Sequence, residues 1–187
     1  MGQLQHVQLH SRARARIAGQ GMALSLRSDL QGSRERLFDL IRGLSEEQFR
    51  YVPDGEAWPI AAHLAHLLRV ERVFVERAKR ALVEDEPRIA STRALNDDDP
   101  GLAQHLAVPQ IIHGMQASRR ELDDLLARCD DAALARAMQH ERLGRMTVAD
   151  VAAKMASHEE EHAAEIGRLA RQVPSSGRVI IPLSRRS

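Results

Sequence analysis

The sequence predicts an all-α protein, an up-down-type four-helix bundle with a long crossover between its second and third helices. Four segments repeat apolar residues at steps of three or four, which is the spacing of one face of a helix. No segment alternates strongly enough to build a sheet. The chain has 187 residues, of which 43% are hydrophobic, and this is enough for one domain with a sizeable core.

The chain divides into three parts by composition. Residues 1–21 are polar and show no clear period, so they are predicted to be an N-terminal arm. Residues 22–173 carry the four helical patterns and are predicted to form the bundle. Residues 174–187 are predicted to be a C-terminal tail, in which residues 179–181 suggest a short strand or an extended segment.

The first helix is predicted from an apolar stripe that ends near residue 44. Its members recur every three or four positions: Leu26, Leu30, Ser33, Leu37, Ile41 and Leu44. Ser45 and Gln48 then have the spacing of a capping box, which opens a short helical turn. The second helix is expected to begin near Trp58 and Pro59, since proline is tolerated at the first helical position, and to reach about Val83.

Two connections frame the remaining helices. Residues 84–107 are acidic and contain two prolines, which indicates a long connection. The third helix follows from a stripe that starts at Val108. Residues 130–146 form a second connection with room for a short helical piece. Thr147 and Asp150 are spaced as a capping box for the fourth helix, which is expected to end near Arg171.

Charge and cysteine content exclude several classes of protein. The net charge is +1, which argues against a nucleic-acid or membrane partner. No run approaches the roughly 20 apolar residues of a membrane helix. Cys129 is the only cysteine, so no intrachain disulfide can form, and a reducing compartment such as the cytoplasm is expected.

The fourth helix carries His158 and His162, four residues apart and within its apolar stripe. This spacing puts both rings on one face of a helix, where they can bind one metal ion. Buried imidazoles need partners, so the alternative is a pair hydrogen-bonded to carboxylates or water. Residues 158–162, His-Glu-Glu-Glu-His, also fit two metalloprotease motifs. No Glu, Asp or His follows Glu165, however, to supply the third metal ligand of such a site.

A third ligand is therefore expected upstream. Outside the arm the upstream histidines are His63, His66, His105, His113 and His140. His113 is predicted to face solvent, and the histidines at 105 and 140 lie in connections, where they are expected to be solvated. Periodicity leaves both His63 and His66 open, because one is central on the apolar face and the other lies on its flank.

Three glutamates are candidates for proton transfer beside such a site: Glu71, Glu159 and Glu161. Glu71 falls within the apolar face of the second helix, so it is expected to contact either a metal-ligating histidine or an arginine. The glutamates between the two histidines of the fourth helix are expected to form a solvated face.

Several of these residues together resemble the DinB-like superfamily. Trp58 is followed eight positions later by His66, and the fourth helix carries His158 and His162 followed by Ile166. Residues 78–87 resemble the end of the second helix and the next loop in the YfiT-like branch, which includes bacillithiol transferases. The resemblance covers about residues 26–171.

The resemblance implies a four-helix bundle that holds a divalent metal, zinc or nickel. By matching positions the ligands are His66, His158 and His162, so the resemblance selects His66. Similar members are S-transferases or isomerases that use low-molecular-weight thiols such as bacillithiol or mycothiol. This chain departs from the family in Pro59, where Ser or Thr is frequent, and in the glutamates at 159–161, which change the charge beside the site.

Three hypotheses of function follow. The first is metal-dependent transfer of a low-molecular-weight thiol to a small electrophile. The second is hydrolysis by a hydroxide bound to the metal. The third is a non-catalytic bundle whose metal stabilises the fold, which would require a fourth protein ligand. The expected partner is a small molecule, and a homodimer stays open.

Overall fold

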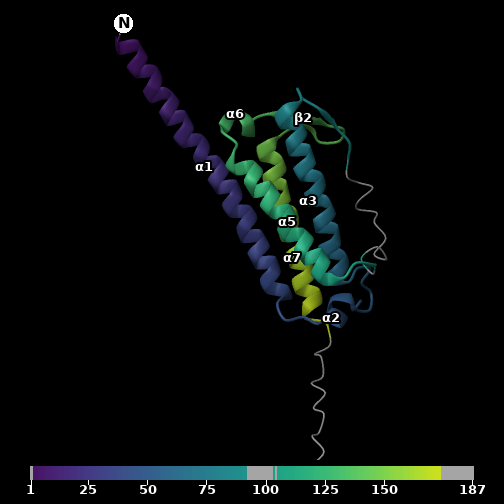
Figure 1. Ribbon diagram of the computed structural model, residues 1–187. Coiled ribbons are helices and arrows are strands. Elements are labelled where there is room, and N and C mark those ends of the chain that lie inside the picture. Colours follow the sequence, from purple (N-terminus) through teal and green to yellow (C-terminus); the bar gives the residue numbers. More distant parts are fainter. Residues whose placement is uncertain (1, 92–102, 104, 174–187) are drawn as a thin grey trace, which may run out of the picture.

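Four long helices packed side by side make up the body of the protein (Figure 1). The computed structural model describes residues 2–91, 103 and 105–173, with side chains from residue 21 onward. The long helices are α1 (Gly2–Ile41), α3 (Ile60–Val83), α5 (Val108–Ala127) and α7 (Val148–Ala170). Two short helices, α2 (Glu46–Arg50) and α6 (Asp131–Leu134), lie in the connections. The predicted four-helix bundle with its long crossover is confirmed.

The crossover decides the direction of α5. The guanidinium of Arg136, which follows α5 and α6, donates to the backbone carbonyl of Ala81 near the end of α3. The guanidinium of Arg50, which precedes α3, donates to the carbonyl of Leu106 just before α5. The two helices therefore begin at one end of the bundle and finish at the other, so α3 and α5 run in the same direction. Helix α7 runs against them, parallel to α1.

The predicted apolar stripes meet in one core. Helix α1 packs mainly on α7, and α3 packs on both α5 and α7. The core contains the following fully buried side chains: Leu30, Leu37, Leu64, Leu67, Met115, Leu122 and Met155. Burial of these faces, at about 25 cal/mol per Å² of apolar surface, is the main favourable term that holds the helices together.

The predicted helix starts are confirmed by their hydrogen bonds. Ser45 accepts from the backbone N–H of Gln48, and Thr147 accepts from that of Asp150. In both capping boxes the residue three positions on also returns a bond to the cap. Helix α3 has Pro59 as its cap and begins at Ile60, one residue later than a proline at the first helical position would place it. These bonds satisfy backbone donors that a helix leaves open at its first turn.

A small sheet of three strands corrects the expectation that no segment of the chain builds a sheet. Strand β1 (Arg88–Ile89) pairs in parallel with β2 (Ala137–His140), and β2 pairs antiparallel with β3 (Gly144–Thr147). Segments of two to four residues are too short to show alternation, and the pairing of β1 with β2 joins residues that are far apart in the sequence. The two connections are therefore tied together at the end of the bundle where α3 and α5 finish.

His140 lies at the end of β2, and the expectation that it is solvated was wrong. Its side chain is buried, and its Nδ1 accepts from the backbone N–H groups of Arg142 and Leu143 in the following turn. Burial lowers the pKa of this ring, with the charge of Arg77 acting in the same direction. The ring is thus a neutral cap for the β2–β3 turn.

The arm at residues 2–21 continues α1 as one helix, whose N-terminal part projects past the ends of the other long helices in Figure 1. Residues 179–181, proposed as a strand, lie outside the described residues. Among the helices described, none is both long and apolar enough to cross a membrane.

Candidate metal centre

Three histidines from two helices converge between α3 and α7. His66 comes from α3, and His158 and His162 come from α7. One ring nitrogen from each lies within 4.8 Å of the others, and in the part of the chain that the structure describes this is the group that could hold a metal ion. The His66 side chain is buried, and the other two are half-buried. The structure thus brings together the three residues selected by the resemblance.

The helix geometry explains why the rings meet. The spacing of four residues stacks His158 and His162 on one face of α7, with ring centroids 4.6 Å apart. His66 lies on the side of α3 that faces α7 and approaches both of them, at centroid distances of 5.3 and 4.9 Å. The Trp58 ring packs edge-on against His66 at 5.4 Å and covers that side of the cluster.

The nitrogen positions fit a divalent ion. The Nε2 atoms of His66 and His158 face each other at 3.2 Å. Two imidazole nitrogens bound about 2.05 Å from a tetrahedral zinc are about 3.3 Å apart. A direct hydrogen bond between the two rings would give a similar distance, but a third ring at the same point is the arrangement of a three-histidine site. The donor set fits zinc or nickel, both of which imidazole binds well.

The electrostatics keep the two histidine rings of α7 in the neutral form that binds metal. Burial lowers the pKa of His162 to about 3, and the charges of His158 and His63 act in the same direction. Burial also lowers the pKa of His158, although Glu161 opposes the shift. Metal ligands must be neutral imidazoles, so a depressed pKa leaves their lone pairs available at neutral pH.

His63 lies beside this cluster on α3. Its Nδ1 is 2.8 Å from Nδ1 of His162, and its ring packs against Trp58 with centroids 5.3 Å apart. Burial lowers its pKa to about 4. Periodicity could not separate His63 from His66 because both lie on the side of α3 that faces α7. Of the two, His66 supplies the nitrogen that falls within the three-histidine group.

Glu161 approaches the site from outside. Its Oε2 lies 3.5 Å from Nδ1 of His158, and its own side chain is exposed. A carboxylate in this position orients a ligating histidine and makes its other nitrogen a better donor. Of the three candidate glutamates, Glu161 is the one placed against a ring of the cluster.

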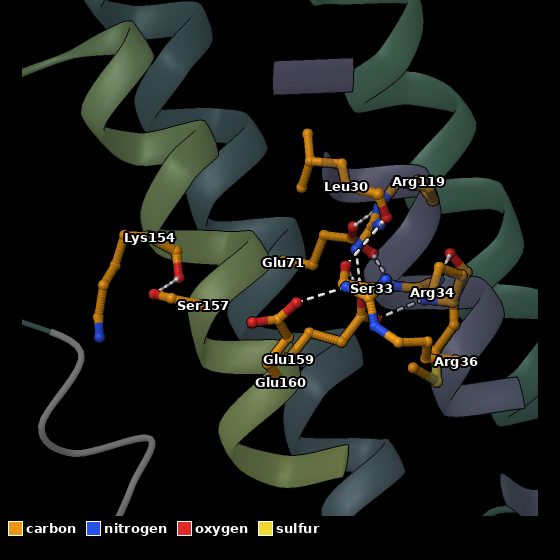
Figure 2. Close-up of polar contacts among 11 residues, drawn as sticks. Leu30, Ser33, Arg34, Arg36, Glu71, Arg119, Lys154, Ser157, Glu159 and Glu160 are labelled. Atoms are coloured by element: carbon orange, nitrogen blue, oxygen red, sulfur yellow. Dashed lines mark hydrogen bonds and ion pairs between the residues drawn. The ribbon is translucent and has the colours of Figure 1, made fainter. Parts of the chain in front are cut away.

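Glu159 is fully buried, and the expectation that it belongs to a solvated face was wrong. Its two carboxylate oxygens bind the guanidinium groups of Arg34 and Arg119, with N···O distances of 2.5 and 2.9 Å. Ser33 donates a further hydrogen bond of 2.5 Å. Glu71 is equally buried, at 3.1 Å from Arg34 and 2.6 Å from Arg119. Figure 2 shows this four-membered ion-pair network between the helices.

The network occupies carboxylates that the sequence suggested for proton transfer. For Glu71 the arginine contact, one of its two expected partners, is the one found. Each arginine also donates to a backbone carbonyl, Arg34 to Met115 and Arg119 to Leu30. Each of the four long helices contributes one member of the network, which therefore links all four. Because it contains two guanidinium groups and two carboxylates, it carries no net buried charge.

The comparison with known families decides where the chain belongs. The model of the DinB superfamily matches residues 29–166. The chain belongs to the DinB superfamily. Among solved structures it is similar to YfiT from Bacillus subtilis, described as a probable metal-dependent hydrolase with an unusual four-helix bundle topology. That similarity has a TM-score of 0.68 at 18% identity and covers 80% of this chain and 86% of YfiT. No curated protein matches the sequence.

Sequence reasoning missed the arginines of this DinB-superfamily bundle. Arg34 and Arg119 each follow a serine of an apolar stripe, Ser33 and Ser118, and both are buried. Two features of the sequence could have indicated a buried ion pair: a serine in each of the two apolar stripes, and Glu71 on the apolar face of α3. His105 and His113 are exposed, as predicted.

The metal-free protein should lose stability as the pH falls from about 6.5 toward 4. The folded chain keeps His162 and His63 neutral because their pKa values are near 3 and 4, whereas the unfolded chain protonates them near 6.5. The unfolded state then binds more protons, so the free energy of unfolding decreases in this window. Thermal melting in a chelator across this pH range measures the effect. A His162→Gln variant should show a shallower decline, and an unchanged slope would contradict the assignment.

Proposed function

We propose that this chain is a metal-dependent enzyme that transfers a low-molecular-weight thiol to a small electrophile. The proposed ligands of a divalent zinc or nickel ion are His66, His158 and His162. The observation that carries the proposal is the convergence of three imidazole nitrogens within 4.8 Å of one another. A fourth imidazole, His63, lies next to this group rather than within it, which leaves a coordination position for an exogenous molecule.

The chemistry that the ion supplies when bound is Lewis acidity, which lowers the pKa of a thiol or water at the open position. The protein sets the positions of the ligating imidazoles. Helices α3 and α7 hold the three rings together, and the Trp58 ring packs against His66. In the proposed reaction the thiol sulfur bonds to carbon, for example of an alkyl halide, and a halide ion and a proton are released.

The proposed roles of the glutamates differ. Glu161 orients His158 through its Nδ1 and is the acidic group nearest the rings. We propose no proton transfer through Glu71 or Glu159, because arginines hold both carboxylates in the core. The proposed substrate is a small molecule, and the thiol chemistry and the lone Cys129 suit the reducing conditions of the cytoplasm.

Hydrolysis is the second candidate, and the similarity to YfiT, described as a probable metal-dependent hydrolase, favours it. The same three imidazoles would hold the ion, and water would occupy the open position. The glutamates at 159–161, in a family where basic residues are frequent there, favour neither reaction by themselves.

An assay of reconstituted protein separates these functions. Protein stripped by a chelator and reloaded with one equivalent of zinc or nickel is offered bacillithiol, mycothiol or another small thiol with a halide, epoxide or quinone. We expect thioether formation that requires both metal and thiol. Metal-dependent cleavage of esters or amides without thiol would support hydrolysis instead. Stoichiometric metal without either activity would favour the non-catalytic bundle.

A further inference from the structure

His63 contacts the proposed metal centre without belonging to its three ligands. It lies one helical turn before His66 on α3, and its Nδ1 is 2.8 Å from Nδ1 of His162. This is the distance of a good hydrogen bond, and two imidazole nitrogens form one only if one donates and the other accepts. The direction of this bond therefore determines which nitrogen of His162 carries its proton.

The contact leaves one nitrogen of His162 for the metal. Because Nδ1 of His162 is engaged with His63, the free lone pair must be on Nε2. In that neutral tautomer Nδ1 carries the proton and donates it to Nδ1 of His63, which accepts. His158 shows the same arrangement, with Nδ1 toward Glu161 and Nε2 toward His66. His158 thus directs Nε2 into the site and Nδ1 toward an outer partner, and this tautomer of His162 would present Nε2 to the metal in the same way.

We propose that His63 is a positioning residue that accepts the hydrogen bond of His162 and fixes that ring with Nε2 toward the metal. The inference rests on the metal site proposed above. Outer partners of this kind hold the ring orientation and increase the basicity of the ligating nitrogen, and their removal weakens metal binding by about 10- to 100-fold. Trp58 packs on the rings of both His63 and His66 and thereby supports this orientation.

Two variants test the hydrogen bond. His63→Leu removes the acceptor and keeps an apolar side chain against Trp58, whereas His63→Asn places an amide oxygen near the position of Nδ1. The zinc dissociation constant is measured on the full chain by competition with a chromophoric chelator. We expect it to rise about 10- to 100-fold in the leucine variant. The asparagine variant should stay within about threefold of wild type, because the amide oxygen can accept the bond.

The matched control is His113→Leu, which removes an exposed histidine from α5 and should leave the dissociation constant unchanged. The absorption spectrum of the cobalt-substituted protein reports the ligand set. It should keep the same tetrahedral pattern in the leucine variant, with shifted bands, because the three ligands stay in place.

Three results would overturn the role of His63. The first is an unchanged dissociation constant in the leucine variant. The second is an asparagine variant as weak as the leucine variant, which would show that hydrogen-bond acceptance is not the cause. The third is the loss of one nitrogen ligand from the cobalt spectrum, which would make His63 a ligand itself. A wild-type chain that binds no metal would instead refute the proposed function, so the two failures are distinguishable.

Discussion

Replacing His158 by alanine should abolish stoichiometric binding of a divalent metal and leave the helical bundle folded. His158 presents its Nε2 3.2 Å from that of His66, and the His162 ring lies directly beside it. Two imidazoles that remain cannot complete a three-histidine site, so the loss of affinity should exceed the roughly 100-fold effect of removing an outer partner. Elemental analysis and zinc titration of the purified variant measure this result.

The control for this variant is His113→Ala, which removes an exposed imidazole from α5 and should bind one metal per chain like wild type. Circular dichroism should show the same helical content in both variants. If His158→Ala bound one metal per chain with wild-type affinity, the three-histidine assignment would be wrong. Loss of activity without loss of metal would place His158 in the reaction rather than in the ligand set.

Replacing Glu159 by alanine should lower the free energy of unfolding by about 3–5 kcal/mol, the cost of breaking a buried ion pair on one side. The substitution leaves Arg34 and Arg119 buried with only Glu71 to balance their two charges. It also removes one of the two acceptors of the Ser33 hydroxyl, the other being the carbonyl of Leu30. Urea denaturation of the metal-free variant measures the effect.

The neighbouring residue provides the control for Glu159. Glu160 pairs with Arg36, and both side chains are more than half exposed, at 55% and 61%. An ion pair in this setting contributes about 0–1 kcal/mol, so Glu160→Ala should change stability very little. Equal stability of the two variants would argue against the buried network. A stable Glu159→Ala protein that had lost activity would restore the catalytic role considered from the sequence.

The long helices were predictable because their signals are local. The apolar period, the capping boxes and the i, i+4 spacing of His158 and His162 are each contained within a few residues. Helix geometry converts the apolar period and the histidine spacing directly into positions on one face of a helix. The strands were not predictable, because β1 and β2 pair across about 50 residues and neither is long enough to alternate.

The misjudged glutamate shows the limit of a helical wheel. Glu159 is the first of three consecutive glutamates after His158, so its sequence neighbours suggested a solvated face. In the bundle α7 is covered by α1 as well as by α3, and the α1 side brings Ser33 and Arg34 onto Glu159. A carboxylate with two guanidinium partners can be buried, which no single helix reveals.

By itself the sequence determined the number and order of the long helices and the histidine pair of α7, since these depend on contacts within one helix. The resemblance selected His66, but only the tertiary structure placed it with the pair and His63 beside it. Only the tertiary structure also moved Glu159 from surface to core. Both outcomes depend on how α1, α3 and α7 rotate and pack against one another, and the residues that meet there are about 90–130 positions apart in the sequence.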